Sequence, residues 1–376
     1  MDGTVYTTGT PALWDDILDF ANYVFSQAHQ PHDFKVLIPS VYGRRDPEVP
    51  SWHFIAVRDG HIKALVADRP RTLTTPGGEL KVGCVGTVSV HPYARSEGHM
   101  KRLMADMIAD ARAKGYDLLM LGGQRQRYNY FGFDQAGWSY EYTLTGTNVR
   151  HCLKDVDASD ITFSDITDEK PDEVDYAFSL SQKQAVHCDR PKAMYLDIMH
   201  NWNQPLRLIR DGDQPIGYIV GDGSEIALED EADLPRVIKA LLGEDASKKM
   251  HITCGPHERA RIATLSRICG GRSVDTVEMI NVLNWPRVIA AMLRYKASFW
   301  PLEDGAFTIA VDGGAPMTVR VKDQAVSVTE EGLTPDLTGD HLSVQRALFD
   351  IEGLGQPGLY KNWFPLPFYV TSVDTF

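Results

Sequence analysis

The spacing of hydrophobic residues changes along the first part of the chain, from a helical period to that of strands. Apolar side chains recur at intervals of three and four residues over 11–25, which predicts an amphipathic helix. Two strand-like runs follow at 53–58 and 61–67, and the turn between them is Asp59-Gly60. Because an aspartate-glycine pair between such runs is typical of a hairpin, these residues are expected to begin an antiparallel sheet.

A strand, a helix and a second strand are predicted next, in that order. Alternate residues of 82–90 would share one face of a strand, which His91-Pro92 ends. From Gly98 the apolar residues return to helical spacing and form a single stripe as far as Ala111. The apolar run 117–122 then indicates a short strand buried beneath that helix. Such an order is typical of a mixed α/β domain.

Part of this pattern recurs after a polar, aspartate-rich stretch at 150–172, which we interpret as a domain junction. Runs at 206–210 and 215–220 flank Asp211-Gly212 much as the earlier runs flank their turn. The shared hairpin indicates an internal duplication, and chance similarity of a short turn is the alternative. From residue 279 a third pattern appears, with helices and strands predicted at 285–295, 307–311, 317–321, 325–329 and 340–349.

Composition and charge narrow the class of function. The 376 residues are 43 % hydrophobic and 24 % charged, as in an ordinary folded protein, and no apolar run approaches the length of a membrane helix. The net charge of −13 argues against a nucleic-acid or anionic-membrane partner. It fits a cationic small substrate, although acidity can equally serve solubility alone.

The cysteines and histidines give no sign of a disulfide framework or a metal site. The five cysteines are an odd number without a Cys-x-x-Cys pair, and Pro31 opposes a helix that would align His29 with His32. We therefore expect reduced thiols and no metal. Because the N-terminus has no signal-like stretch, a cytoplasmic location is expected.

The loop between the predicted strand and helix carries the candidate chemistry. It runs from His91 to Met100 and opens into the helix, whose first turn presents free backbone N–H groups and the positive end of the peptide dipoles. Such a helix start suits a pyrophosphate, Gly98 allows its close approach, and Arg95 adds positive charge. The alternative is an ordinary strand-to-helix turn with a solvated arginine.

The segment 88–104 resembles the coenzyme A motif of the GNAT acetyltransferase superfamily, hydrophobic-x-Val-x-Pro-x-x-Arg-x-x-Gly. The run 128–133 and the closing stretch 364–376 are similar to the signature and the ending of its Eis-like (enhanced intracellular survival) branch. The resemblance implies an α/β (α+β) fold class: tandem GNAT domains, the second degenerate, followed by an α+β domain similar to sterol carrier protein. The implied domains are 1–148, 149–278 and 279–376.

The resemblance also implies which residues bind acetyl-CoA as the co-substrate. They belong to the strand end, the loop and the helix start: Val88, Ser89, Val90, Arg95, Ser96, Glu97, Gly98, His99 and Met100. The sequence departs from the family here, because Ser96 and Glu97 stand where further arginines are usual. A carboxylate beside a pyrophosphate is unfavourable unless it points away.

Acetyl transfer needs a proton donor for the leaving thiolate, a base for the amine and N–H donors for the oxyanion. Backbone groups of 88–90 can pair with the pantetheine arm as an added strand would. Tyr128 matches the family's general acid, and Tyr130 and Tyr140 are rivals that spacing alone does not separate. The resemblance implies that the chain's terminal carboxylate, carried by Phe376, is the general base.

In the second copy the corresponding turn is 226–234, which carries four carboxylates and no Arg-x-x-Gly. These charges would repel a pyrophosphate. The second copy is therefore expected to be structural, and only the first is expected to bind the cofactor.

Together these features predict an acetyl-CoA-dependent N-acetyltransferase that acts on a primary amine of a polyamine-like or aminoglycoside-like molecule. Two alternatives stay open. One is acetylation of protein lysines, and the other is a non-catalytic module that binds an apolar ligand in its last domain. The family resemblance further implies a homo-oligomer.

Overall fold

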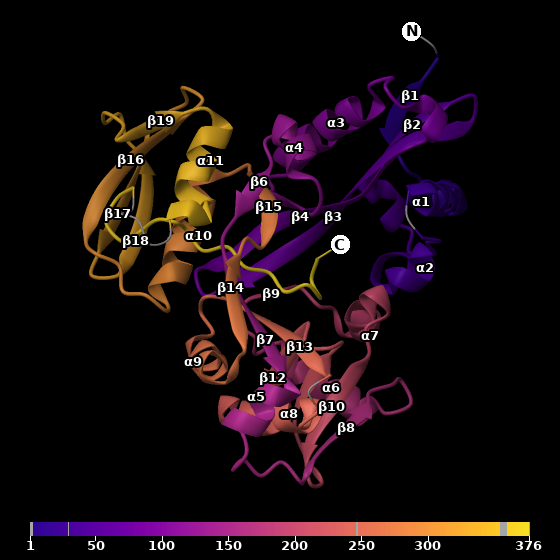
Figure 1. The fold of residues 1–376 in the computed structure, drawn as a ribbon. Coiled ribbons are helices and arrows are strands. Elements are labelled where there is room, and N and C mark those ends of the chain that lie inside the picture. The colour runs from indigo at the N-terminus through magenta and orange to yellow at the C-terminus, as the bar shows by residue number, and fades with distance from the viewer. Residues whose placement is uncertain (1–2, 29, 246, 354–358, 376) are drawn as a thin grey trace.

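The structure, a computed structural model, describes residues 3–28, 30–245, 247–353 and 359–375. It has three parts that meet at the centre of the molecule (Figure 1). The first part holds a long sheet with helices on both sides. The second lies below it in this view, and the third lies beside the first and sends the end of the chain to the centre.

The first part is built on a mixed sheet. In the described residues its strand order is β1-β2-β3-β4-β5-β15-β6, with β9 paired to β3. Its strands are β1 (Val5–Thr8), β2 (His53–Arg58), β3 (His61–Thr75), β4 (Gly78–Val90), β5 (Leu118–Leu121), β6 (Asp134–Ala136), β9 (His187–Cys188) and β15 (Glu278–Val282). Its helices are α1 (Trp14–Ala28), α2 (Phe34–Leu37), α3 (His99–Ala113) and α4 (Arg125–Tyr128). The predicted helices, hairpin and strands of this part are confirmed.

Both faces of this sheet are covered. Helix α3 packs on one face, where Leu103 joins Val85 in one apolar cluster. Helix α1 covers part of the opposite face, through a cluster that contains Ile17 and Leu65. Helix α10 (Trp285–Ala297) covers the rest of that face, around Val82. This double cover explains why the central strands are apolar on both sides.

The second part contains two smaller sheets, with the orders β12-β11-β10-β8 and β13-β7-β14 in the described residues. Its strands are β7 (Ser139–Thr145), β8 (Ile161–Asp165), β10 (Leu206–Asp211), β11 (Gln214–Val220), β12 (Glu225–Leu228), β13 (Lys249–Cys254) and β14 (Gly271–Asp275). Its helices are α5 (Gly146–Cys152), α6 (Pro171–Ser181), α7 (Tyr195–Met199), α8 (Leu234–Leu242) and α9 (Arg259–Ile268). The predicted second hairpin is confirmed as β10 and β11.

The third part has one sheet in the order β18-β17-β16-β19, also counted over the described residues. Its elements are β16 (Gly305–Val311), β17 (Met317–Lys322), β18 (Ala325–Glu330), β19 (Leu337–Gly339), α10 and α11 (His341–Phe349). The helices and strands predicted from 285 onward are confirmed. Residues 363–375, which we call the C-terminal segment, then leave this part and run to the centre of the molecule (Figure 1).

The chain passes between the first and second parts at β7 and again at β15. The boundaries between these parts therefore differ from the predicted ones. After β6 the chain leaves the first sheet, and β7 pairs with β13 and β14 in the second part, whereas β15 returns to the first sheet between β5 and β6. The predicted boundary at 148/149 therefore falls inside α5, and that at 278/279 falls inside β15. Sheet membership depends on which strand edge is open in three dimensions, and the local sequence pattern does not carry that information.

A buried ionic network fixes the C-terminal segment to the first two parts. The carboxylate of Asp374 accepts hydrogen bonds from Nε and Nη2 of Arg190, at 2.9 and 2.8 Å, and from the backbone N–H of Cys188, at 2.9 Å. Arg190 in turn donates to Glu225 of β12, at 2.8 and 2.6 Å. Arg71 of β3 lies 3.6 Å from the Asp374 carboxylate. The network thus connects all three parts through groups that are removed from water.

The C-terminal segment also makes a close backbone contact with the turn between β6 and β7. Gly137 has a φ of +66°, and a Cβ added there would lie only 2.1 Å from the carbonyl oxygen of Phe368. Glycine is needed at this position both for its left-handed conformation and for the room that it leaves.

We expect Gly137→Ala to destabilise the protein by about 3 kcal/mol or more, because the new methyl group meets backbone that has no space to move. Gly60→Ala is the matched control. Gly60 has a similar φ of +74° but has nothing within 4 Å of an added Cβ, so that variant should lose only about 1 kcal/mol. Urea unfolding measures both values. Equal losses would contradict the close contact with Phe368.

We expect Asp374→Asn to destabilise the protein by about 3–5 kcal/mol at neutral pH, because it leaves Arg190 without a full counter-charge in a dry site. The neighbouring arginines, Arg190 first, hold the pKa of Asp374 below its ordinary value of 3.8 despite its burial. The stability that Asp374 contributes is therefore present above about pH 4 and is lost as the pH falls through the lower, folded-state pKa.

Urea unfolding at neutral and acid pH measures this contribution. The wild type should lose stability below about pH 4 through Asp374, and Asp374→Asn should lack that part of the acid dependence. Asp106→Asn, which removes an exposed pair with Arg102 on α3, should change stability by less than about 1 kcal/mol. An Asp374→Asn protein as stable as this control would contradict the role of the network.

Candidate active site

The central feature of the site is a gap between β4 and β5. These parallel strands pair only over Val82–Val85 and Leu118–Leu121, and beyond that point Gly86–Val90 pairs with β3 alone among the described strands. The pairing of β3 with β4 is irregular at the same place, between Leu65 and Ala67, and Thr87 has a φ of +45°. An irregularity of this kind bends and twists a strand, so β4 turns away from β5 and one edge of its backbone is left open.

This open edge lines a cavity of about 1100 Å³. The cavity also takes in the loop after β4 and the first turn of α3, so the strand edge and the helix start face one space. All of the predicted cofactor-binding residues except Glu97 line it, namely Val88, Ser89, Val90, Arg95, Ser96, Gly98, His99 and Met100.

The loop reaches the helix through two residues with left-handed backbone. Ser96 and Gly98 have φ values of +66° and +85°. A Cβ added at Gly98 would meet nothing within 4 Å, so glycine is favoured there by its conformation. Gly98 is the N-cap of α3, and no side chain caps the helix from that position. The free N–H groups of the first turn therefore remain available to a ligand.

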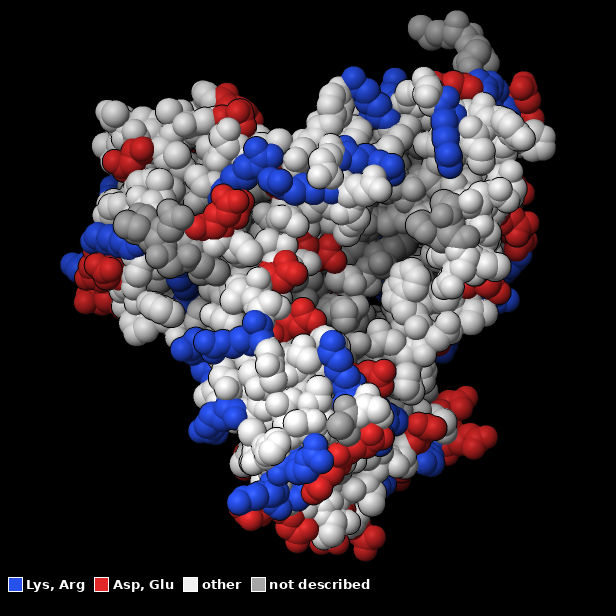
Figure 2. Space-filling model, viewed as in Figure 1, with Lys and Arg blue, Asp and Glu red and all other residues white. Residues whose placement is uncertain are grey.

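The charges around this cavity are positive. Arg95, Lys101 and Arg127 line it, whereas none of its described lining residues is an aspartate or glutamate. Figure 2 shows Lys and Arg side chains gathered over α3 and α4, above the hollow at the centre of the molecule. A helix start surrounded by cations is suited to a phosphorylated ligand.

Glu97 is the one predicted cofactor-binding residue that does not line the cavity. Its carboxylate pairs with Arg58 of β2, at 2.6 Å, and lies 3.1 Å from Nε2 of His99. The other ring nitrogen of His99 lies 2.9 Å from the hydroxyl of Tyr6. The hydrogen bond from Arg58 holds the pKa of Glu97 below its ordinary value. Its charge is thus directed to Arg58 and away from the ligand space.

Tyr128 lies at the C-terminal end of α4 and is buried in the wall of the cavity. Burial raises the pKa of its phenol, and the neighbouring Arg127 opposes that rise. Its hydroxyl is therefore protonated at neutral pH and can donate a proton. Of its rivals, Tyr130 is 65 % exposed at the rim, and Tyr140 pairs with Cys254 in another sheet and is not part of the lining.

The far end of the cavity is apolar and includes a residue that the sequence analysis missed. Phe25 and Phe34 of the first part form one wall, and Trp202 of the second part completes it. Ser40 holds the segment that carries Trp202, because its Oγ accepts a hydrogen bond from Asn201 at 2.9 Å. No local signal marks Trp202, since only the packing of two parts brings it to the site.

Two other predictions concern residues or groups beyond this lining. Phe376, predicted as the carrier of the general base, lies outside the described residues.

Among the described residues, no group of three or more His, Cys, Asp and Glu side chains is arranged to hold a metal ion. In the same part of the chain, no helix combines the length and the apolar character that crossing a bilayer requires.

The corresponding turn in the second part has different chemistry. Strand β12 leads through Glu229, Asp230 and Glu231 into α8. Lys183 pairs with Glu229 at 3.0 Å, and Arg261 pairs with Glu231. Asp230 accepts a hydrogen bond from the backbone N–H of Ala232. Arg236, in the first turn of α8, is paired with Asp211 and Asp233, so it is not free to bind a phosphate.

Comparison with known families agrees with this geometry. Residues 6–138 match a family model described as an acetyltransferase (GNAT) domain. These residues are a GNAT acetyltransferase domain. The match contains the strand, loop, helix start and Tyr128 described above, and it ends at Trp138, just before β7 leaves the first sheet.

No curated protein matches the chain, but solved structures resemble it along nearly its whole length. A GCN5-related N-acetyltransferase from Anabaena variabilis is 15 % identical, covers 99 % of this chain and 100 % of its own, and superposes with a TM-score of 0.69. Eis1 from Mycobacterium abscessus is 14 % identical, with the same coverage and a TM-score of 0.66.

At these identities the likeness shows the fold. The predicted mixed α/β class is confirmed, and the several sheets agree with tandem GNAT domains followed by a further α+β domain. The predicted enzyme class, an N-acetyltransferase, is confirmed by the GNAT domain.

Proposed function

We propose that the protein transfers the acetyl group of acetyl-CoA to a primary amine of a cationic small molecule. One observation carries the proposal: the open edge of β4 and the start of α3 line the same cavity. A pantetheine arm can pair with the strand edge while the pyrophosphate reaches the helix start. The cations Arg95, Lys101 and Arg127 along the lining support a ligand with several phosphate charges.

The chemistry follows from this placement. A thioester held along Gly86–Val90 has strand N–H groups beside its carbonyl, and such donors stabilise the oxyanion that forms when an amine attacks. Holding both reactants in one cavity supplies much of the rate. The leaving thiolate needs a proton, and we assign its donor as Tyr128, which is buried, protonated at neutral pH and part of the same wall.

The general base predicted from the resemblance, the carboxylate of Phe376, stays a prediction. The C-terminal segment as far as Thr375 lies at the centre of the molecule and is held there by Asp374. Support for this base is thus limited to the course of the segment that precedes it.

The cationic acceptor is supported by the distribution of acidic groups. Carboxylates are absent from the described lining of the large cavity but gather in a neighbouring one, where Glu141, Asp222, Asp275 and Glu278 line the wall. In Figure 2 red side chains lie in the hollow at the centre of the molecule. A positively charged amine would be attracted to this side and repelled by the cations of the other.

Several finer assignments remain part of the proposal. Membership of the Eis-like branch is supported by the likeness to Eis1 over nearly the whole chain. Three further assignments rest on the sequence resemblance. They are the likeness of the third part to sterol carrier protein, the assembly into a homo-oligomer and the division into domains. A cytoplasmic location is supported by the free thiols of all five cysteines.

Tyr128→Phe tests the proton donor. We expect kcat to fall by about 100-fold, because the thiolate then leaves without a positioned acid, while the dissociation constant of coenzyme A stays unchanged. Steady-state kinetics and calorimetry measure the two quantities. Tyr130→Phe, which removes a hydroxyl from the exposed rim of the same cavity, should leave kcat within about threefold of the wild type.

A mass-spectrometric screen of primary amines with acetyl-CoA tests the function as a whole. The panel includes spermidine, kanamycin and a lysine-containing peptide, and we expect acetylation of the small polycations. A purified protein that binds neither acetyl-CoA nor coenzyme A in calorimetry would contradict the proposed function. Equal losses of binding and turnover in Tyr128→Phe would contradict only the role of that residue.

A further inference from the structure

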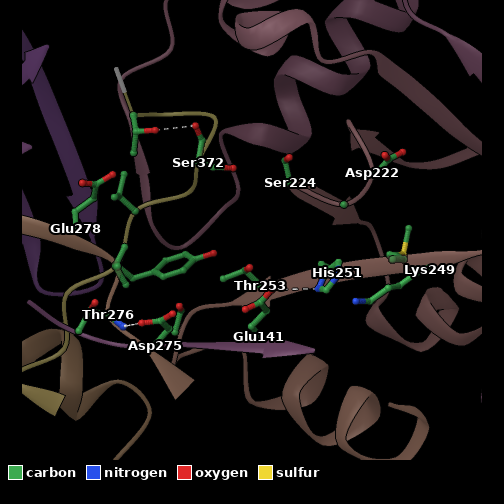
Figure 3. Close-up of a pocket in the computed structure, with 17 residues that line it drawn as sticks. Glu141, Asp222, Ser224, Lys249, His251, Thr253, Asp275, Thr276, Glu278 and Ser372 are labelled. Carbon is green, nitrogen blue, oxygen red and sulfur yellow. Dashed lines mark hydrogen bonds and ion pairs between the residues drawn. The ribbon is translucent and has the colours of Figure 1, made fainter. Parts of the chain in front are cut away.

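A second cavity, of about 540 Å³, lies between the second part and the C-terminal segment. Strands β7, β13 and β14 form one wall, and the C-terminal segment forms another (Figure 3). Lys249, His251 and Asp222 lie toward one end of the cavity in this view, and Glu278 lies at the opposite end. The cavity is therefore lined along its length by polar side chains, and carboxylates are the majority of those that carry a charge.

Glu278 lines this cavity and lies beside Gly122, a residue that lines the acetyl-CoA cavity. It is the first residue of β15, in which the next residue, Met279, pairs with Leu121 of β5. A Cβ added at Gly122 would lie 3.5 and 3.8 Å from the two carboxylate oxygens of Glu278. Gly122 itself lines the acetyl-CoA cavity. The carboxylate of Glu278 thus lies directly behind the wall of that cavity.

The same wall carries the proposed acid. Gly123 follows Gly122, and a Cβ added at Gly123 would lie 3.3 Å from Cε2 of Tyr128. Two glycines without side chains therefore separate a carboxylate on one side from the phenol of Tyr128 on the other. A side chain at position 122 or 123 would occupy the space between the carboxylate of Glu278 and the phenol of Tyr128.

Glu278 is more buried than Asp222 and Asp275 of the same cavity, which are exposed. Glu141 lies 3.1 Å from Nδ1 of His251, and Asp275 accepts a hydrogen bond from the backbone of Thr276 at 2.8 Å. Among the described residues no Lys, Arg or His lies within ion-pair distance of Glu278. Burial raises the pKa of its carboxyl to about 7.

The surrounding elements carry few groups that could change this titration. The titratable or charged side chains on β6, β14 and the C-terminal segment, which pair with β15 or share its end of the cavity, are Asp134, Arg272, Asp275, Tyr369 and Asp374. Asp374 is paired with Arg190. Asp134 is paired with Arg125 and Arg346, and β5 carries no titratable residue. Glu278 is thus an uncompensated carboxylate beside the reaction centre.

We infer that Glu278 accepts the proton of the acceptor amine, which enters through the acidic cavity and meets the thioester beside Gly122 and Gly123. This inference rests on the proposed acetyl transfer. An alkylammonium is protonated at neutral pH and does not attack a carbonyl until it loses a proton. A carboxylate that is half-protonated near neutral pH is a suitable acceptor.

The proton and electron balance is as follows. The ammonium N–H bond breaks and its proton passes to a carboxylate oxygen of Glu278, so the nitrogen lone pair can form the C–N bond to the acetyl carbon. The C–S bond then breaks, and the thiolate takes the proton of Tyr128. Tyr128 regains a proton from the nitrogen of the tetrahedral intermediate, and Glu278 releases its proton to water. One proton is released in each turnover.

The pH profile of the wild type is the first test. With spermidine and kanamycin as acceptors, kcat/KM should fall on the acid side with a midpoint near pH 7, the pH at which Glu278 becomes protonated. Glu278→Gln should lower kcat by at least about 100-fold and remove this midpoint. Coenzyme A affinity and the melting temperature should stay unchanged, which separates a catalytic loss from a folding defect.

Asp222→Asn is the matched control, since it neutralises an exposed carboxylate at the opposite end of the same cavity. This variant should keep the midpoint at the same pH. A wild type without an acid-side midpoint between about pH 6 and 8, or a Glu278→Gln enzyme that keeps it, overturns the inference.

A variant with residues appended after Phe376 distinguishes the two candidate bases. If the appended residues remove the midpoint and Glu278→Gln keeps it, the terminal carboxylate is the base and the inference about Glu278 is overturned. If Glu278→Gln removes the midpoint and the appended residues do not, the inference is supported. A wild type that acetylates no amine of the panel overturns the proposed function, and the inference with it.

Discussion

The arrangement of the site depends on one buried ionic interaction, the pairing of Asp374 with Arg190. Arg190 also binds Glu225, and Arg71 stands close enough to balance the second negative charge. A buried charge is tolerated only when its partners satisfy it, and each partner here comes from a different part of the chain. Moving any one of these charged side chains would leave another buried charge without a partner, and the free-energy cost of that loss keeps the three parts in one arrangement. Trp202 and the C-terminal segment reach the centre only in that arrangement.

Strand pairing and charge distinguish the two strand-to-helix connections and support cofactor binding by the first one. In the first part β4 diverges from β5 after Val85 and leaves an open edge beside a helix start whose carboxylate, Glu97, is paired with Arg58. In the second part the turn before α8 carries acidic side chains that are already held by Lys183 and Arg261. A similar strand-to-helix connection can therefore bind an anion or repel it, depending on a few charges at its first turn.

Much of this was predictable from the sequence, because it is local. The periods of 82–90 and of α3, the turn chemistry of Asp59-Gly60, and the loop with Arg95 and Gly98 all act over a few neighbours. The division of β7 and β15 between two sheets was not predictable, because both strands are short and nothing in their own residues identifies the strand edge beside which each one pairs. The ion pair of Glu97 was not predictable either, because it depends on a residue that is distant in the sequence. The sequence position of Glu97 suggests a contact with the ligand, but its partner Arg58 lies far away along the chain.

The two cavities give the two reactants separate electrostatic environments. In the proposed function, acetyl-CoA is a polyanion that would lie beside Arg95, Lys101 and Arg127, whereas an alkylammonium would lie beside the carboxylates of the neighbouring cavity. Each environment attracts one reactant and repels the other, so neither blocks the other's place. Between them the wall is reduced to Gly122 and Gly123, which carry no charge and no side chain. In the proposed reaction the C–N bond would thus form at the boundary between a positive and a negative field, after the amine has lost its proton and while acetyl-CoA is held through the phosphates of its coenzyme A moiety.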